Sequence, residues 1–502
     1  MKNALFLRIW ERLNINFLKI FINKVREKRL DALYLGIIIT TFLIRVINLN
    51  YNSAFNDEGI YIVVGRMGLF ENDWSSYGAN FWMAGLPYIY PPLSALAFQT
   101  GGLIGSRLLN IFFGVFLVEE IYRLTRLINL FDKKTNQVAG ILAAFFAGFS
   151  GVGIFVSNLA TYDILSFLLF VFALNSFLKS KDTNNGKYYF LSSIALLLAF
   201  FTKIIIAIFF PITFIVFLCI LKNKSFKQKR IAVIYLLIPF LIGISLYLFF
   251  YFDNLSVYIA THRNLGKAKA LETIFQEIIN IVGLALISAI PSFLILIRYR
   301  KIKEVMILLI FALATPIFHL FLKREQTLNK HLYLTVVSLS ILIGYGFSVL
   351  ILNEKRLVKL LSSLTLIILM FLYFMDSQKT LIRLQKQWLD STSLQEFLRY
   401  NVKPGNKILT ENGGAVILAL YDITFPPENI TTFDWIDYSN LNDESGYIQA
   451  VKDKYFDYIE LNNQYPGKES LRENIRKEMI GNYLLVYKKD DFEVYRLNNN
   501  LF

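Results

Sequence analysis

Residues 188–221, "YYFLSSIALLLAFFTKIIIAIFFPITFIVFLCIL", form one nearly uninterrupted apolar run. As a single helix this run would be about 50 Å long, too long for a hydrocarbon core of about 30 Å. Basic residues flank both of its ends, and basic flanks mark the cytoplasmic side of a membrane. The run therefore predicts a tight helical hairpin, in which Thr202-Lys203 is the only polar break.

The rest of the composition agrees with a multi-pass membrane protein. The chain has 502 residues, 55% of them hydrophobic and only 18% charged. Its net charge of +15 lies largely in short clusters between apolar runs, which indicates membrane topology rather than nucleic-acid binding. The only cysteine, Cys219, lies within the apolar run and excludes an intrachain disulfide.

The same reasoning divides the whole chain. Residues 1–30 are expected to be an amphipathic cytoplasmic segment, residues 31–375 the membrane region and residues 50–103 its first outer loop. The cytoplasmic side follows from the basic loops, which all fall on one side if the N-terminus is inside. A second hairpin, 137–178, is predicted to reverse at Ser157-Asn158. Eleven spans are predicted, at 31–49, 104–124, 137–156, 161–178, 188–202, 204–221, 231–252, 277–297, 304–322, 332–352 and 357–375.

The polar remainder, residues 376–502, predicts a small α/β domain on the extracytoplasmic face. Strands are expected at 407–411 and 456–461, and a hairpin of 483–489 with 492–497 is expected to turn at Asp490-Asp491. Helices are expected at 379–400, 444–454 and 468–479. The predicted fold class is thus an all-α membrane bundle with a C-terminal α/β domain.

Charged residues from distant parts of the sequence are predicted to meet at the outer membrane face. Each could individually extend its charge into the headgroup region, which is common for interface residues. Lys203 is less easily explained in this way, because it lies on the outer side against the charge rule. The set comprises Asp57 and Glu58 after the first span, Asp163, Lys203, and Arg324 with Lys330 and His331.

Transfer of a sugar from a lipid phosphate is a reaction that needs such a cluster. Lysine or arginine would stabilise the leaving phosphate, and a carboxylate would take the proton of the acceptor hydroxyl. The apolar spans would hold the polyprenyl tail. Residues 71–103 suit an amphipathic interface segment, with Trp74 and Trp82 at headgroup depth and Pro91-Pro92 preventing one continuous helix.

Five stretches carry a resemblance to a known family. In order they are "NDEGIYIVVGRM" (56–67), "YPPLSA" (90–95), "SNLATYDILSFLLFVFAL" (157–174), "AFFTKIIIAIFFP" (199–211) and "KHLYLTVVSLSILIGYG" (330–346). Their order and topology resemble the polyprenyl-phosphate-sugar glycosyltransferases of the GT-C superfamily. The protein O-mannosyltransferase-like and aminoarabinose-transferase-like groups are the most similar, and the resemblance covers most of the membrane region.

This resemblance implies roles on both sides of the reaction. Asp57 would act as the base or orient the acceptor, and Glu58 would support it. Tyr61 and Arg66 match substrate-binding positions on the helix that follows the acidic pair.

On the donor side, Asp163 matches the second acidic position and Lys203 the lysine that contacts the donor phosphate. Residues 330–334, which include Tyr333, match a segment that closes the phosphate site. The aminoarabinose group carries an acid and a base where Ile89 and Tyr90 stand here, which argues against lipid A and aminoarabinose as substrates.

The expected protein is therefore a membrane glycosyltransferase with a polyprenyl-phosphate-linked sugar donor, and its acceptor is a protein, a glycolipid or a polysaccharide. No metal site is expected, because His262, His319 and His331 form no ligand-spaced motif and His319 is interpreted as a packed bundle histidine. A carboxylate-bound Mg²⁺ or Mn²⁺ stays an open alternative. The alternative functions are a lipid or sugar transporter or flippase, and a polysaccharide polymerase or ligase.

Overall fold

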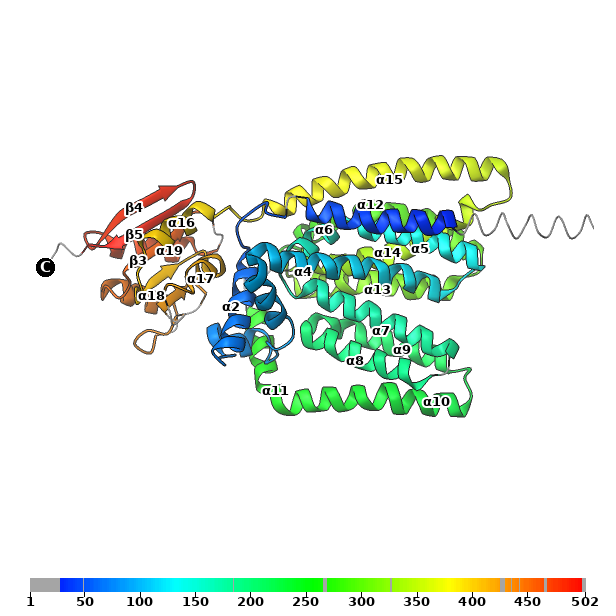
Figure 1. Cartoon of the computed structure of the whole chain (residues 1–502), viewed down its shortest axis with the longest axis horizontal. Helices are drawn as coiled ribbons and strands as arrows, with labels where there is room; N and C mark the ends of the chain where they lie inside the picture. Colours follow the sequence, from blue (N-terminus) through cyan, green and yellow to red (C-terminus); the bar gives the residue numbers. More distant parts are fainter. Residues whose placement is uncertain are drawn as a thin grey trace, which may run out of the picture.

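The computed structural model describes residues 28–498, apart from 48, 184, 265–268, 326, 425–428, 435, 442 and 465–466. Most of the expected cytoplasmic segment, residues 1–27, lies outside the described residues. A bundle of long helices carries a small α/β domain at one end, and helix α2 lies between the two (Figure 1). The predicted fold class is confirmed. We call the end of the bundle next to the α/β domain the domain-side end.

Each of the eleven predicted spans contains helix. Eight helices in the described part are long and apolar enough to cross a membrane, or nine if α5 and α6 are counted as one bent span. The remaining two are the shorter α8 and the helical residues 28–46. The bounds are α4 Tyr90–Ile128, α5 Lys133–Gly148, α6 Gly151–Asn158, α7 Asp163–Thr183, α8 Gly186–Thr202, η2 Ile204–Phe209, α9 Phe210–Leu221, α10 Phe226–Ala232, η3 Val233–Leu237, α11 Ile238–Asn264, α12 Leu271–Arg298, α13 Ile302–Leu322, α14 Leu328–Ile351 and α15 Arg356–Gln385.

The hairpin predicted at Thr202-Lys203 is present. Lys203 is extended, with φ −153° and ψ 118°, between the end of α8 and the start of η2. The rings of Phe200 and Phe210 lie 5.5 Å apart, whereas ten residues of continuous helix would separate them by about 15 Å. The chain therefore reverses here.

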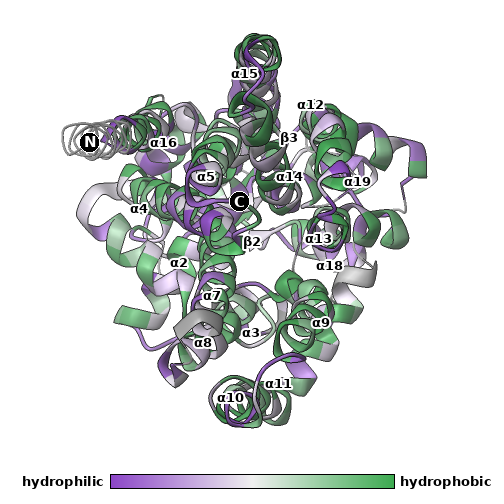
Figure 2. Ribbon diagram, turned by 90° about the vertical axis from the view of Figure 1, so that its right-hand side faces the viewer, coloured by the Kyte–Doolittle hydropathy of each residue, from purple (hydrophilic) through white to green (hydrophobic). Residues whose placement is uncertain are grey.

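Helix α14 is the central helix of the bundle. It packs against α5, α12 and α13, and 83% of its most apolar window is buried. A helix that is hydrophobic on every side requires this kind of burial. Gly346 allows the close approach of α12, because a Cβ atom there would lie 2.3 Å from the side chain of Ser292. Viewed end-on, the surrounding helices are largely hydrophobic (Figure 2), and many of their large apolar side chains, such as Phe249 and Phe371, are exposed.

Residues 50–103, expected to be the first outer loop, contain short helices of their own. Helix α2 spans Asn56–Phe70, η1 spans Ser76–Gly78 and α3 spans Ala79–Trp82. Helix α4 begins at Tyr90 with the two prolines in its first turn, where their missing N–H groups cost little, and it kinks at Gly101-Gly102. The expected interface segment is thus broken at the places where proline and glycine stand.

The C-terminal domain contains a five-stranded sheet of order β2-β1-β3-β5-β4. β1 pairs in parallel with β2 and β3, and β4 and β5 form the predicted antiparallel hairpin. The bounds are α16 Thr392–Asn401, β1 Ile408–Thr410, α17 Gly413–Leu420, β2 Ile430–Thr432, α18 Glu444–Lys452, β3 Tyr458–Asn462, α19 Glu469–Met479, β4 Tyr483–Lys489 and β5 Phe492–Leu497.

Two features of this domain differ from the sequence prediction. A single helix over 379–400 is wrong, because α15 ends at Gln385 and α16 begins at Thr392. Between them the Asp390 carboxylate accepts hydrogen bonds from the backbone N–H groups of Thr392 and Ser53, which holds the chain in a turn. β2 and α17 were not predicted, since both are short and lie in a stretch with no clear period.

Helix α17 docks directly on α2. A Cβ atom on Gly59 would lie 1.9 Å from the carbonyl oxygen of Gly414, so only glycine allows the two backbones to meet. The N–H of Gly414 donates a 2.6 Å hydrogen bond to Oδ1 of Asn56. This contact sets the C-terminal domain beside the first turn of α2, which carries Asp57.

Candidate functional site

Four charged side chains form a chain of ion pairs at the domain-side end of the bundle. Nζ of Lys330 lies 2.6 Å from Oδ2 of Asp57 and 3.9 Å from Oδ2 of Asp163. Nζ of Lys203 contacts Oδ1 of the same Asp163. The structure thus brings together residues from α2, α7, the α8–η2 break and α14, and we call this set the charged cluster.

Helix ends position most of the charged cluster favourably. Asp57 lies in the first turn of α2 and Asp163 begins α7, where a negative charge complements the helix dipole. Lys203 is the C-cap of α8, where a positive charge does the same. Lys330, in the first turn of α14, is placed against the dipole and relies on the two carboxylates.

The four side chains differ in exposure. Asp57 is 33% exposed, whereas the side chains of Lys203, Lys330 and Asp163 are 8%, 5% and 1% exposed. A molecule that approaches from the solvent therefore meets the carboxylate of Asp57 before the other members.

Aromatic rings line the charged cluster. The rings of Tyr61 and Tyr162 lie 4.6 Å apart, and Nζ of Lys203 lies 4.9 Å from the Tyr162 ring centroid. Nζ of Lys330 lies 4.8 Å from the ring of Phe55. Burial raises the pKa of the Tyr61 phenol well above its ordinary value, and the nearby Tyr162, Asp57 and Asp163 raise it further. Tyr61 is therefore a neutral hydroxyl at physiological pH.

His331 and Arg324 lie next to the charged cluster. His331 follows Lys330 on α14 and is buried, and its Nδ1 lies 2.9 Å from Nε2 of His319 on α13. Nδ1 of His319 lies 2.9 Å from the carbonyl oxygen of Arg324, in the turn after α13. The interpretation of His319 as an ordinary packed histidine is therefore incomplete, because its ring is bonded to a predicted site residue.

Glu58 points away from the charged cluster and belongs to a separate network. Nε of Arg107 donates to Oε1 of Glu58 at 2.9 Å, and Nη2 donates to Oε2 at 2.8 Å. The backbone N–H groups of Ala160 and Phe55 donate two further hydrogen bonds to the Glu58 carboxylate, at 2.7 and 2.8 Å. Both charged side chains are fully buried. This geometry suits a structural anchor, which differs from the catalytic role predicted for Glu58.

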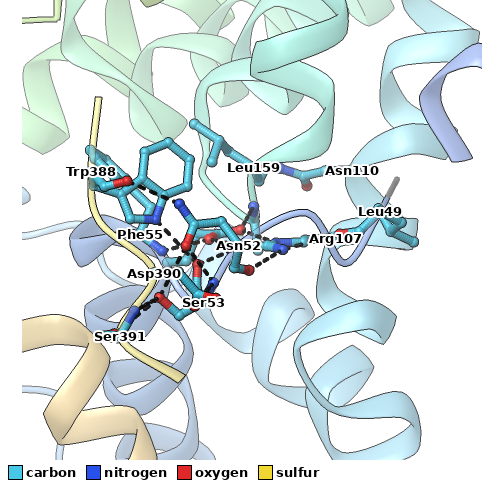
Figure 3. A network of polar contacts seen from close by, with 12 residues as sticks. Leu49, Asn52, Ser53, Phe55, Arg107, Asn110, Leu159, Trp388, Asp390 and Ser391 are labelled. Carbon is cyan, nitrogen blue, oxygen red and sulfur yellow. Dashed lines mark hydrogen bonds and ion pairs between the residues drawn. The ribbon is translucent and has the colours of Figure 1, made fainter. Parts of the chain in front are cut away.

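The Arg107 network also holds the linker to the C-terminal domain (Figure 3). The carbonyl oxygen of Ser53 accepts from Nη2 of Arg107 at 3.0 Å and from the indole N–H of Trp388 at 3.3 Å. The backbone N–H of Ser391 donates to the Ser53 hydroxyl at 2.8 Å. The start of the first outer loop and the segment after α15 are therefore bound to each other.

Arg66 and Tyr333 also lie outside the charged cluster. The Arg66 guanidinium lies 4.0 Å from the ring centroid of Tyr421, so this side chain faces the C-terminal domain. Tyr333 is fully buried in the bundle, where its hydroxyl donates to the carbonyl of Ala147 at 3.1 Å. Neither side chain contacts the charged cluster, and the substrate contacts expected of Arg66 and Tyr333 stay predictions.

Two buried arginines were not predicted as important. Arg107 lies within an apolar span, and Arg45 near the end of another donates to the carbonyl of Gly148 at 2.7 Å. Both are fully buried. The signal in the sequence was the presence of an ionised side chain in an apolar segment, which requires a specific partner.

The residues of the charged cluster do not fit a divalent cation. Both of its carboxylates are engaged by lysine ammonium groups, Asp57 by Lys330 and Asp163 by Lys203. Among the described residues, no group of three or more His, Cys, Asp or Glu side chains is placed to hold a metal ion.

A cavity of about 510 Å³, lined mainly by apolar side chains, lies within the bundle. Its lining includes Phe209 and Leu334, which follow Lys203 and Lys330 in the sequence, and it also includes Lys303 at the start of α13. The remaining lining comes mainly from apolar side chains of α7, α9, α13 and α14.

No protein-family model matches the sequence, and no curated protein matches it. Solved structures share the fold. ArnT from Cupriavidus metallidurans bound to undecaprenyl phosphate has a TM-score of 0.62 at 11% identity, over 93% of this chain and 98% of that chain. AglB from Archaeoglobus fulgidus, in complex with an inhibitory peptide and a dolichol-phosphate, has a TM-score of 0.54 at 15% identity, over 93% and 74%.

The arabinofuranosyltransferase AftD from Mycobacteria has a TM-score of 0.52 at 12% identity, over 94% of this chain and 40% of that chain. The fold predicted from the GT-C resemblance is confirmed, and this chain is a multi-pass membrane protein of that fold. At these identities the similarity concerns the fold.

Proposed function

We propose that the protein is a glycosyltransferase that moves a sugar from a polyprenyl-phosphate donor to an acceptor hydroxyl. The observation that carries this proposal is the charged cluster, in which two buried lysines lie beside a partly exposed carboxylate at a helix-bundle end. The similarity to structures of ArnT and AglB bound to polyprenyl or dolichol phosphates supports the choice of donor.

The charged cluster can carry both halves of the transfer. The carboxylate of Asp57 takes the proton of the acceptor hydroxyl while the acceptor oxygen bonds to the anomeric carbon. The bond between that carbon and the phosphate oxygen breaks, and its electron pair leaves with the phosphate. The ammonium groups of Lys203 and Lys330 stabilise the departing anion in a site with little water.

The apolar cavity suits the donor's tail. Phe209 and Leu334, which are close along the chain to the two lysines, line one part of it, and most of its other lining residues are apolar. If the phosphate lies at Lys203 and Lys330, the first isoprene units of its lipid would therefore lie in the part of the cavity that Phe209 and Leu334 line. Burial of these units would stabilise the complex by about 0.8 kcal/mol per CH₂ group.

We place the reaction on the extracytoplasmic face, with the N-terminus inside. The turn between α14 and α15, which carries Lys355, and helix α10 lie at the end of the bundle opposite the C-terminal domain (Figure 1). Positive charge on that end supports a cytoplasmic assignment for it. A phosphatase reporter fused to the C-terminus should be active in the exported compartment, and activity of a cytosolic reporter there would contradict the orientation.

Direct lipid binding tests the proposed function. The purified protein in detergent should bind undecaprenyl phosphate, and Lys203→Ala should weaken binding about tenfold or more, because a charged hydrogen bond contributes about 1.5–3 kcal/mol. Lys355→Ala, an exposed lysine at the other end of the bundle, is the matched control and should bind normally. Equal affinity of the Lys203 variant and the wild type would contradict the assignment of the phosphate site.

A further inference from the structure

The His319–His331 pair beside the charged cluster has no role in the transfer as described above. Both rings are buried, at 2% and 5% exposure, and they are joined by a 2.9 Å contact between Nε2 of His319 and Nδ1 of His331. Among the described residues, Nε2 of His331 has no hydrogen-bond partner. A buried nitrogen without a partner is costly, so its presence needs a physical explanation.

The hydrogen bonds determine where the protons of the pair lie. The carbonyl oxygen of Arg324 can only accept, so Nδ1 of His319 carries a hydrogen. If His319 is neutral, its Nε2 has a lone pair and Nδ1 of His331 must be the donor. A neutral His331 then presents a bare lone pair at Nε2. One added proton at Nε2 would leave every existing bond of the pair intact and convert this nitrogen into a donor.

The His331 ring lies within electrostatic reach of the groups assigned to the phosphate. Lys203, His319 and Lys330 act electrostatically on the His331 ring. Lys203 also acts on His319, so the pair and the two lysines share one region. The charged groups that act on the pair are Lys330 on α14 and Lys203 after α8, and the carbonyl oxygen of Arg324 after α13 contacts His319. Asp57 on α2 and Asp163 on α7 pair with Lys330, and Asp163 acts electrostatically on Tyr258 on α11.

The four charges of the charged cluster itself sum to zero. Asp57 and Asp163 carry two negative charges, and Lys203 and Lys330 carry two positive charges. A phosphodiester brings one negative charge, and the monoester product carries up to two, because its second pKa is about 6. A lone pair at Nε2 would repel the phosphate oxygens, whereas an N–H⁺ would donate a short, charge-assisted hydrogen bond to them.

We propose that His331 takes up one proton at Nε2 when a polyprenyl phosphate binds, and that it donates this N–H to the phosphate. The proton comes from the solvent, and only the N–H bond forms. His319 positions His331 by accepting its Nδ1–H, which stabilises the imidazolium more than the neutral ring. This inference rests on the proposed function, since it concerns the same phosphate site.

Calorimetry can count the proton. The probe is the methyl diester of undecaprenyl phosphate, whose phosphate does not titrate near neutral pH, in buffers of different ionisation enthalpy. We expect the wild type to take up about one proton per bound lipid at pH 7.5, and its affinity to fall about tenfold toward pH 9. His331→Asn keeps an amide near the Nδ1 position and should bind weakly with no proton uptake.

Two further variants separate loss of the proton from misfolding and test whether His319 positions His331. His331→Gln carries an uncharged donor near the Nε2 position and should retain binding that no longer depends on pH. His319→Leu should move the pH midpoint of binding lower, a change that a packing role alone would not produce. Proton uptake that persists in His331→Asn, or binding by the wild type without uptake, would overturn the inference. Absence of binding by the wild type would overturn the proposed function, and this inference with it.

Discussion

Asp57 and Glu58 follow each other on α2, yet they belong to two different kinds of network. Glu58 accepts four hydrogen bonds, two from Arg107 and one each from the N–H groups of Phe55 and Ala160. The other donors of Arg107 reach the carbonyls of Leu49, Asn52 and Ser53 at 3.0 Å. The carboxylate and the guanidinium therefore have no capacity left for a ligand.

The charged cluster is unsaturated by comparison. Oδ2 of buried Asp163 has no hydrogen-bond partner among the described residues, and Asp57 keeps one-third of its side chain exposed. Lys203 and Lys330 share the carboxylates of Asp57 and Asp163. Backbone N–H groups, in contrast, supply two of the four hydrogen bonds to the Glu58 carboxylate. A saturated buried pair holds the structure together, whereas an unsaturated one has donors and acceptors left for a substrate.

Arg107→Met should produce the largest effect, because it leaves the Glu58 carboxylate buried without its cation. We expect a loss of about 3–5 kcal/mol in stability, seen as a lower thermal unfolding temperature in detergent. Arg383→Met is the matched control, since Arg383 is 39% exposed where it pairs with Glu277 and its ion pair should contribute less than about 1 kcal/mol. Equal stability of the two variants would contradict the structural role assigned to the Arg107–Glu58 pair.

Asp57→Asn should affect turnover rather than folding. The amide oxygen can still accept from Lys330, but it cannot take the acceptor's proton, so sugar transfer should fall about 10²-fold, or about 2.7 kcal/mol in activation free energy. The assay is release of polyprenyl phosphate from donor lipid extracted from the source cells. Glu71→Gln, at the exposed end of the same helix, should keep full activity. Normal turnover in Asp57→Asn would end the assignment of Asp57 as the base.

Glu460 offers a smaller test on a third carboxylate. Its Oε2 accepts from the N–H groups of Glu411 and Asn412, but its buried Oε1 has no partner among the described residues. Burial, with the charge of Glu411, raises the pKa of Glu460 from 4.5 to about 7. Between these values the unfolded chain releases a proton that the folded chain keeps, so stability falls as pH rises through this window, by about 3 kcal/mol in total.

Glu460→Gln should abolish this pH dependence. Hydrogen exchange of the peptide that contains β1, corrected for the intrinsic effect of pH, should slow toward pH 5 in the wild type and stay level in the variant. A pH profile that is the same in both proteins would show that another group titrates.

The site residues differ in how far the sequence could indicate them. Lys203 was identifiable because it interrupts an apolar hairpin, and Asp163 because the second hairpin needs a turn just before it. Arg66 lies apart from the charged cluster, because α17 docks on α2 and presents Tyr421 to the guanidinium, a contact that the sequence did not indicate. His319 was underestimated because its partner follows only after a chain reversal, in the first turn of α14.

Hydropathy, helix length and charge bias are local properties of the chain, so the sequence alone was enough to predict the membrane helices and the reversal at Thr202-Lys203. The different partners of Asp57 and Glu58, in contrast, follow from the tertiary structure. Their partners, Lys330 and Arg107, are 273 and 49 residues away, and the glycine contact that holds the C-terminal domain joins residues 358 apart. Such pairings depend on how helices pack, and no local pattern specifies which of two adjacent carboxylates turns inward.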